Sequence, residues 1–249
     1  MSSAPKPDVT PRGRLRGRRI AVTGAASGIG RATARLFSQE GASLALLDRD
    51  PAGLKEIANE TDGARFEVDI TAEDEVASAA ERAATALGGI DGVVNAAGIM
   101  YRGRATDVPA TNWRQVLEVN LTGTYIVTRS FLPWLTSESA ASVVNIASAQ
   151  GLLPNTPGYS AYAASKGGII ALTKALAAEL APQIRVNCIS PGMVNTAMAD
   201  GHRDGASNYA LKRIADPNEI ATALLFLTST DASYVTGSVL GVDGGRAFH

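Results

Sequence analysis

Short apolar runs alternate with longer amphipathic segments along most of the chain. Seven runs are rich in Val, Ile and Leu and lack a clean period of two, which indicates strands buried on both faces, as in a parallel sheet. They span residues 20–23, 43–48, 65–69, 92–95, 142–147, 185–190 and 238–242. Segments with apolar residues at helical spacing cover 31–40, 72–87, 111–136, 162–181 and 217–228. The alternation predicts an α/β fold: a doubly wound, seven-stranded parallel sheet with helices on both faces.

Neither a break in composition nor an internal repeat divides the chain, so we expect one domain over residues 17–249. Residues 1–16 differ from the rest, because they contain three prolines and no apolar periodicity. The first 19 residues also hold six basic side chains against one aspartate. Such an arm could contact nucleic acid or an acidic partner, but chain ends of this kind are usually poorly ordered. We therefore expect a disordered basic arm and no nucleic-acid partner.

Composition narrows the class of protein further. The 249 residues are 45% hydrophobic with a formal net charge of -1, which indicates a globular domain rather than a disordered chain or a polyanion binder. One cysteine, Cys188, excludes an internal disulfide, and two histidines cannot build a His/Cys zinc cluster, so no metal is expected. The sequence shows no secretory signal and no apolar run long enough for a bilayer. We expect a cytoplasmic protein without a membrane partner.

The first predicted strand runs into a glycine-rich turn that precedes the first helix. Its sequence, Thr23-Gly24-Ala25-Ala26-Ser27-Gly28-Ile29-Gly30, has the spacing G-x-x-x-G-x-G. Gly24 permits a tight turn, Gly28 lets a pyrophosphate approach the backbone, and Gly30 lets the helix pack on the strand. The N–H groups of the helix N-terminus would then face the phosphates. The turn, with Ser27 and Ile29, is a candidate dinucleotide-binding loop of a Rossmann fold.

The ends of the next strands supply further candidates for cofactor binding. Asp48 ends the second strand, where a carboxylate accepts hydrogen bonds from ribose hydroxyls and repels a 2′-phosphate, which favours NAD over NADP. Arg49 beside it could instead serve a phosphate, and Asp48 could also cap the helix that begins near Asp50-Pro51. Residues placed to meet the adenine or to let the cofactor pass stand at the ends of the third and fourth strands: Asp69 and Ile70, then Asn95, Ala96 and Gly98.

Tyr162 and Lys166 stand four residues apart on a predicted helix, so their side chains leave the same face. A free phenol has a pKa of about 10 and is a poor base at neutral pH. A nearby ammonium group and the positive ring of an oxidised nicotinamide both favour the phenolate. The pair therefore predicts a general acid/base, although Y-x-x-x-K alone is common by chance.

The full set of motifs resembles the short-chain dehydrogenase/reductase family over about residues 17–246. The elements come in the family's order: Thr23-Gly24-x-x-x-Gly28-x-Gly30, Asn95-Ala96-Ala97-Gly98, Asn120, Ser148, Tyr162-x-x-x-Lys166, Pro191-Gly192 and Val242-Asp243-Gly244-Gly245. The resemblance implies hydride transfer between NAD(H) and a secondary alcohol or ketone. It departs from the family pattern at Ala96, where a second asparagine is frequent.

The resemblance also implies roles for individual residues. Tyr162 would exchange the substrate proton, and Lys166 would lower its pKa and hold the nicotinamide ribose. Ser148 would hydrogen-bond the substrate oxygen, and Asn120 would anchor a water that relays protons. The nicotinamide carboxamide would meet the segment that follows the sixth strand, namely Pro191, Gly192, Val194 and Thr196. Association through segments 111–136 and 162–181, to a homotetramer, is implied as well.

Substrate identity stays open at this level. Gln150 and Asn155 would suit a polyol or sugar alcohol, whereas an apolar set would suit a hydrophobic ketone or acyl chain. That set comprises Met100, Leu152, Leu153 and Met193, with Tyr101 beside it, and residues 195–215 are a candidate lid. Two other functions remain: an NADPH-dependent reductase of 3-oxoacyl thioesters, and a non-catalytic dinucleotide-binding regulator. Retention of the four catalytic candidates argues against the second.

Overall fold

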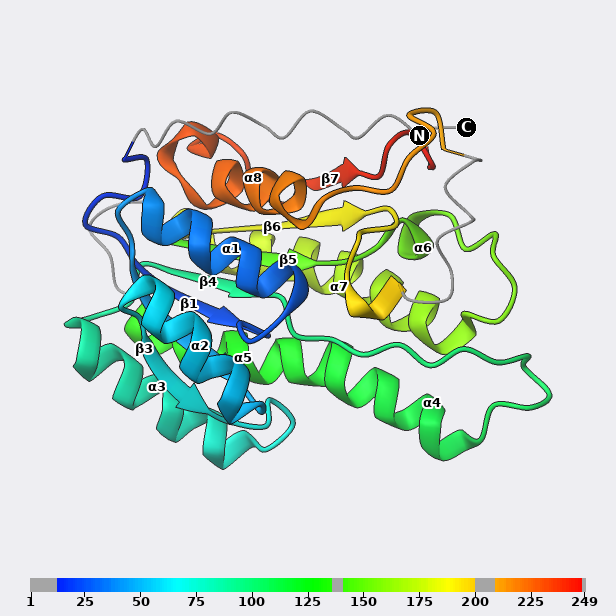
Figure 1. Ribbon diagram of the computed structural model, residues 1–249, viewed down its shortest axis with the longest axis horizontal. Helices are drawn as coiled ribbons and strands as arrows, with labels where there is room; N and C mark the ends of the chain where they lie inside the picture. Colours follow the sequence, from blue (N-terminus) through cyan, green and yellow to red (C-terminus); the bar gives the residue numbers. More distant parts are fainter. Residues whose placement is uncertain (1–12, 136–140, 200–208, 248–249) are drawn as a thin grey trace.

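A parallel sheet forms the centre of the protein. The computed structural model describes residues 13–135, 141–199 and 209–247 (Figure 1). The strand order is β3-β2-β1-β4-β5-β6-β7, with every neighbouring pair parallel, which confirms the predicted doubly wound sheet. The strands are β1 (Arg19–Thr23), β2 (Ser43–Asp48), β3 (Ala64–Glu67), β4 (Gly92–Asn95), β5 (Ala141–Ile146), β6 (Ile184–Pro191) and β7 (Val239–Val242).

Helices cover both faces of this sheet (Figure 1). One face carries α1 (Gly28–Gln39), α2 (Pro51–Thr61) and α8 (Pro217–Thr228), and the other carries α3 (Glu73–Leu87), α5 (Gly123–Phe131) and α7 (Ser160–Leu180). Shorter helices are α4 (Ala110–Leu117) and α6 (Ala149–Leu152), with 3₁₀ turns at Leu132–Trp134, Ala197–Ala199 and Thr230–Ala232. Within the described ranges, no helix is both long enough and apolar enough to cross a membrane.

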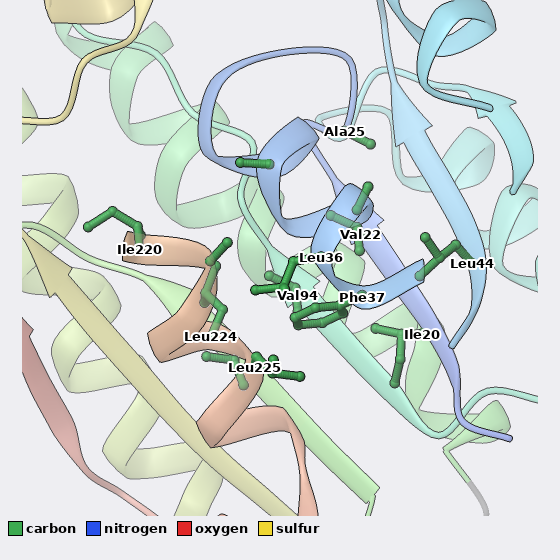
Figure 2. Packing of buried hydrophobic residues seen from close by; sticks show 14 of the residues in the cluster. Ile20, Val22, Ala25, Leu36, Phe37, Leu44, Val94, Ile220, Leu224 and Leu225 are labelled. Carbon is green, nitrogen blue, oxygen red and sulfur yellow. The ribbon is translucent and has the colours of Figure 1, made fainter. Parts of the chain in front are cut away.

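The strands lack a period of two because both of their faces are buried. On β1, Ile20 and Val22 belong to the cluster under α1 and α8, whereas Ala21 belongs to the cluster on the opposite face. Figure 2 shows the first cluster, which includes Phe37 of α1 and Leu224 of α8. Both side chains are fully buried. This packing holds α1, and with it the turn at its N-terminus, against the carboxyl end of the sheet.

The predicted helix at 111–136 is wrong in detail, because a π-helical turn interrupts it. The turn, η1 (Glu118–Thr122), separates α4 from α5 and contains Asn120, which is fully buried. Its side chain takes hydrogen bonds outside its own helix, which an uninterrupted apolar period does not reveal. For α2, which sequence analysis gave only as a helix near Asp50-Pro51, the N-cap is Asp50 rather than Asp48, and Pro51 follows it as Pro217 follows Asp216 at α8.

The folded domain begins earlier than residue 17. Leu15 is fully buried in the cluster under α1, and the Arg14 guanidinium lies 2.8 Å from a carboxylate oxygen of Glu40. Residues 13–16, which sequence analysis assigned to the basic arm, therefore pack on the domain. Residues 1–12 lie outside the described part of the chain.

Candidate active site

The turn between β1 and α1 has no room for side chains at its glycines. Gly24 has a φ of +65°, and a Cβ there would lie 2.8 Å from the backbone of Ala97. A Cβ on Gly30 would lie 2.1 Å from the carbonyl oxygen of Gly24. The first turn of α1 is thus pressed directly onto the end of β1, as predicted for a loop that binds a pyrophosphate.

A cleft opens over this turn and brings most of the predicted cofactor residues together. It is lined by Gly24, Ser27, Gly28, Ile29, Gly30, Asp48, Asp69, Ile70, Ala96, Gly98 and Thr196, and also by Arg49. Gly28 has a φ of +52°, and a Cβ there would point across the cleft to within 3.3 Å of Thr196. The Ser27 side chain makes no capping bond, so it leaves the N–H groups of the first turn of α1 uncapped. These features fit a dinucleotide with its pyrophosphate at the helix N-terminus.

Asp48 supports the glycine turn as well as lining the cleft. Its Oδ2 accepts a hydrogen bond of 3.0 Å from the Ala26 N–H, and its Oδ1 accepts one of 3.1 Å from the Asp50 N–H. A carboxylate has about four acceptor sites, so two remain for hydroxyl groups of a ligand. The neighbouring Asp69 accepts two bonds from Thr71, and these lower the pKa of its carboxyl below the usual value.

Asn95 does not take the position expected for a cofactor ligand. It is buried behind the cleft, where its Nδ2 donates to Thr128 Oγ1 at 3.1 Å and to Asn145 Oδ1 at 2.9 Å. Asn145 in turn donates to Thr173 on α7, at 2.9 Å. Because alternate side chains of a strand leave opposite faces of the sheet, Asn95 joins β4 to β5 and to the helices on that face. Asn95 therefore links these elements and does not line the cleft.

A second cavity adjoins the cofactor cleft and holds the predicted chemistry. Both are lined by Ile29, Thr196 and Met198, so they meet along these residues. Ser148 and Tyr162 line the second cavity, at the carboxyl end of β5 and near the start of α7. Pro191, Gly192 and Val194 also line it rather than the cleft.

Lys166 is buried behind Tyr162. Its Nζ lies 5.6 Å from the centre of the Tyr162 ring and donates a hydrogen bond of 2.7 Å to the Ile146 carbonyl. Burial lowers the pKa of Lys166 to about 8, although Cys188 opposes this shift. A Cβ on Gly98 would come within 3.6 Å of the same Nζ, so a cofactor that passes Gly98 would lie beside the amine.

The pKa of Tyr162 is raised, not lowered, in the chain by itself. Burial is the main cause, and it outweighs the hydrogen bond with Ser148, which favours the phenolate. The expected lowering of this pKa by Lys166 is therefore not seen in the cofactor-free protein, because burial of the phenol dominates. Without a bound cofactor the phenol is held as an acid.

Asn120 lies in neither cavity but connects two elements of the site. Its Oδ1 accepts from the Ile99 N–H at 2.8 Å, and its Nδ2 donates to the Ile99 carbonyl at 2.9 Å and to Ser165 Oγ at 3.0 Å. The Ser165 hydroxyl donates to the Tyr162 carbonyl at 2.8 Å. Asn120 thus fixes the loop after β4 to the turn of α7 that carries Tyr162.

The substrate cavity differs from its expected lining. Met100, Gln150 and Met193 line it as predicted, whereas Tyr101, Leu152, Leu153 and Asn155 do not. Tyr159 and Arg246 also line it, although sequence analysis did not place them there, and Tyr209 of the 195–215 segment lines it as well. The Tyr209 hydroxyl accepts a bond of 3.1 Å from the Met193 N–H, which joins residue 209 of the candidate lid to the cavity wall. Residues 200–208 of that segment lie outside the described ranges.

Comparisons with known proteins agree with this geometry. The family model described as enoyl-(acyl carrier protein) reductase matches residues 24–247. A 3-oxoacyl-[acyl-carrier-protein] reductase of Thermotoga maritima is 40% identical over 93% of this chain and 98% of its own. A galactitol 2-dehydrogenase of Cereibacter sphaeroides is 42% identical over 93% of this chain and 96% of its own. The solved carveol dehydrogenase of Mycobacterium avium, in complex with NAD, superimposes with a TM-score of 0.91 at 28% identity and covers 95% of this chain and 100% of its own.

Proposed function

Because the chain belongs to the short-chain dehydrogenase/reductase family, we propose that it oxidises a secondary alcohol, or reduces the ketone, with NAD(H). The family places it among oxidoreductases that act on CH–OH and C=O groups with a dinucleotide cofactor. One observation carries the proposal: Tyr162 and Ser148 line a small-molecule cavity that meets the dinucleotide cleft. A bound nicotinamide would supply the hydride donor or acceptor at its ring carbon.

The residues of this chain would bind and protonate the substrate oxygen. In the direction of ketone reduction, Ser148 donates a hydrogen bond to the carbonyl oxygen and the Tyr162 phenol gives up its proton there. In the direction of alcohol oxidation, Tyr162 must start as the phenolate. The raised pKa of the phenol opposes that state, so oxidation needs the positive charge of an oxidised nicotinamide beside Tyr162 and Lys166.

A tyrosine-to-phenylalanine exchange tests the acid/base. Tyr162→Phe keeps the ring and removes the proton, so kcat is expected to fall by at least 100-fold while the Kd for NADH changes less than threefold. Tyr234→Phe, at a fully exposed phenol, is the matched control and keeps its activity. Substantial turnover by the Tyr162 variant would exclude this residue as the acid/base.

The preference for NAD rests on Asp48. Its carboxylate lines the cleft and has acceptor sites left for ribose hydroxyls, while its charge repels a 2′-phosphate. Calorimetric titration with NADH and, separately, NADPH tests this preference first. We expect NADH to bind more tightly than NADPH. Asp48→Ala should narrow this difference in affinity between the two cofactors. A preference for NADH in the variant that is unchanged from the wild type would exclude Asp48 as the discriminating residue.

A second candidate function is the NADPH-dependent reduction of 3-oxoacyl thioesters. Arg49 lines the same cleft beside Asp48, where a guanidinium could meet a 2′-phosphate, and the Thermotoga relative bears this activity in its name. Tighter binding of NADPH, with turnover of an acetoacetyl thioester, would favour this candidate over alcohol oxidation.

We also propose a homotetramer that forms through α4, α5 and α7. Trp113 on α4 and Tyr125 on α5 expose large apolar surfaces, which an interface would bury. Light scattering after size-exclusion chromatography should give four times the chain mass of 25.7 kDa. The cytoplasmic location expected from the sequence stays a prediction.

A further inference from the structure

Arg246 reaches from the C-terminal end of the described chain into the wall of the substrate cavity. The residue is 9% exposed and lines the cavity together with Tyr162 and Gln150. Its Nη2 donates to Asn155 Oδ1 at 2.8 Å and to Thr156 Oγ1 at 3.2 Å, and its Nη1 donates to the Leu153 carbonyl at 3.3 Å. These contacts hold the guanidinium in one orientation beside the loop that follows Ser148.

No carboxylate of the described residues neutralises this buried cation. Among residues 13–135, 141–199 and 209–247, no acidic side chain forms an ion pair with Arg246. The neighbouring Asp243 uses its carboxylate to accept bonds from the N–H groups of Gly245 and Ala247. Three of the five guanidinium N–H groups have partners, so two remain without one among the described residues. A buried charge is normally paired, and Arg246 lines the cavity that holds Ser148 and Tyr162.

A second arginine, Arg102, is exposed and contacts an aromatic ring of the cavity lining. The Arg102 guanidinium lies 5.4 Å from the centre of the Tyr159 ring, and that ring also lines the cavity. Because the ring packs against Tyr162, with centroids 6.4 Å apart, the charge stands near the reacting group. Arg246 and the tyrosines give this end of the cavity a cationic and hydrogen-bonding character.

Gln150 supplies an independent sign of a polar ligand. Gln150 lines the same cavity, and its Oε1 is buried and has no hydrogen-bond partner among the described residues. A buried amide oxygen left without a donor is costly, by roughly 1–3 kcal/mol. A hydroxyl of a substrate would provide the missing donor. Leu152 and Leu153, which would have formed a hydrophobic slot, do not line the cavity.

We propose that the substrate is a hydroxylated anion, a sugar carboxylate or sugar phosphate, whose acidic group binds Arg246 and whose hydroxyl donates to Gln150. Planar recognition of carboxylate or phosphate by an arginine fork gives both affinity and orientation. The anchored acidic group positions a carbinol of the same molecule between Ser148 and Tyr162. This inference rests on the proposed function, because the carbinol is the group that is oxidised.

Matched substrates that differ in charge test the inference. Wild-type enzyme with NAD⁺ is assayed on a panel of D-hexonates, the corresponding hexitols and the hexitol phosphates. We expect kcat/KM for at least one anion to exceed that of its neutral partner by tenfold or more. The better of the carboxylate and phosphate series identifies the acidic group. A preference for the neutral hexitols would overturn the proposal.

Arg246→Gln separates recognition of charge from support of the loop. It should lower kcat/KM for the anion by at least tenfold, mainly through KM, and change that for the hexitol by less than threefold. Arg213→Gln removes the same charge outside this cavity, at the ion pair with Glu219, and serves as the control. Equal losses on both substrates would show that Arg246 only supports the loop, and would overturn the proposal.

A neutral secondary alcohol, 1-phenylethanol, distinguishes the two levels of failure. Turnover of this alcohol that depends on Tyr162, without turnover of any anion, would overturn the inference and leave the proposed function intact. Absence of NAD-linked turnover on every alcohol would overturn both.

Discussion

Asn120 offers a sharp test of how the site is held together. It is fully buried in the π-helical turn, and its amide makes hydrogen bonds of 2.8, 2.9 and 3.0 Å with the Ile99 N–H, the Ile99 carbonyl and Ser165 Oγ. Asn120→Ala removes all of these bonds and leaves their partners buried without replacements. At about 1 kcal/mol net for each bond, the free energy of unfolding should fall by about 3 kcal/mol.

A melting experiment converts this magnitude into an observable. For a chain of this size each kcal/mol corresponds to about 2–4 °C, so the melting temperature of Asn120→Ala should fall by about 6–12 °C. The catalytic rate should fall as well when measured well below that temperature, because Ser165 passes the contact on to the Tyr162 backbone. KM should change less than kcat, since Asn120 lines neither cavity.

Thr122→Ala is the matched control on the same turn. The Thr122 side chain is only partly buried and makes no hydrogen bond with the described residues, so its removal should change the stability by less than about 0.5 kcal/mol. If Asn120→Ala melts within 2 °C of this control, the hydrogen bonds of Asn120 do not support the site and the reasoning is refuted.

Three further predictions concern the glycine turn, the buried lysine and the start of the domain. Gly30→Ala places a Cβ 2.1 Å from the Gly24 carbonyl, so binding of NADH should weaken at least tenfold; an unchanged Kd in calorimetry would contradict this. Lys166 has a pKa of about 8 in the folded protein against 10.5 otherwise, so between these pH values the unfolded chain binds a proton that the folded one lacks. The unfolding free energy should therefore rise with pH in this window, by up to about 3 kcal/mol relative to Lys166→Met. Urea titrations of both cofactor-free proteins at pH 7.5 and 10 measure this change. If the lysine were normal, the unfolding free energy would change equally with pH in the two proteins. Leu15→Ala opens a cavity in the core and should cost about 2–4 kcal/mol; a melting temperature equal to that of the wild type would show that residue 15 is not part of the domain.

Local regularities in the sequence determined the fold class and the cofactor end of the site. Strand runs without a period of two predicted a sheet covered on both faces, and the structure confirms the seven parallel strands. The glycines of the first turn predicted a close approach of helix and strand, because only a residue without a side chain fits there. The four-residue spacing of Tyr162 and Lys166 predicted their shared helix face. Each of these signals lies within a few residues of the feature it predicts.

Other features were decided only by contacts between distant parts of the chain. The face on which the Asn95 side chain lies, and hence its partners, depends on pairing with β5, 50 residues away. The acidic form of Tyr162 follows from burial by surrounding elements, which a spacing rule does not measure. Arg246 meets Asn155 across 91 residues of sequence, without a periodicity or motif to signal the contact. Sequence patterns predict local geometry. Tertiary contacts between distant residues, by contrast, decide the cavity wall, its charge and its free hydrogen-bonding groups.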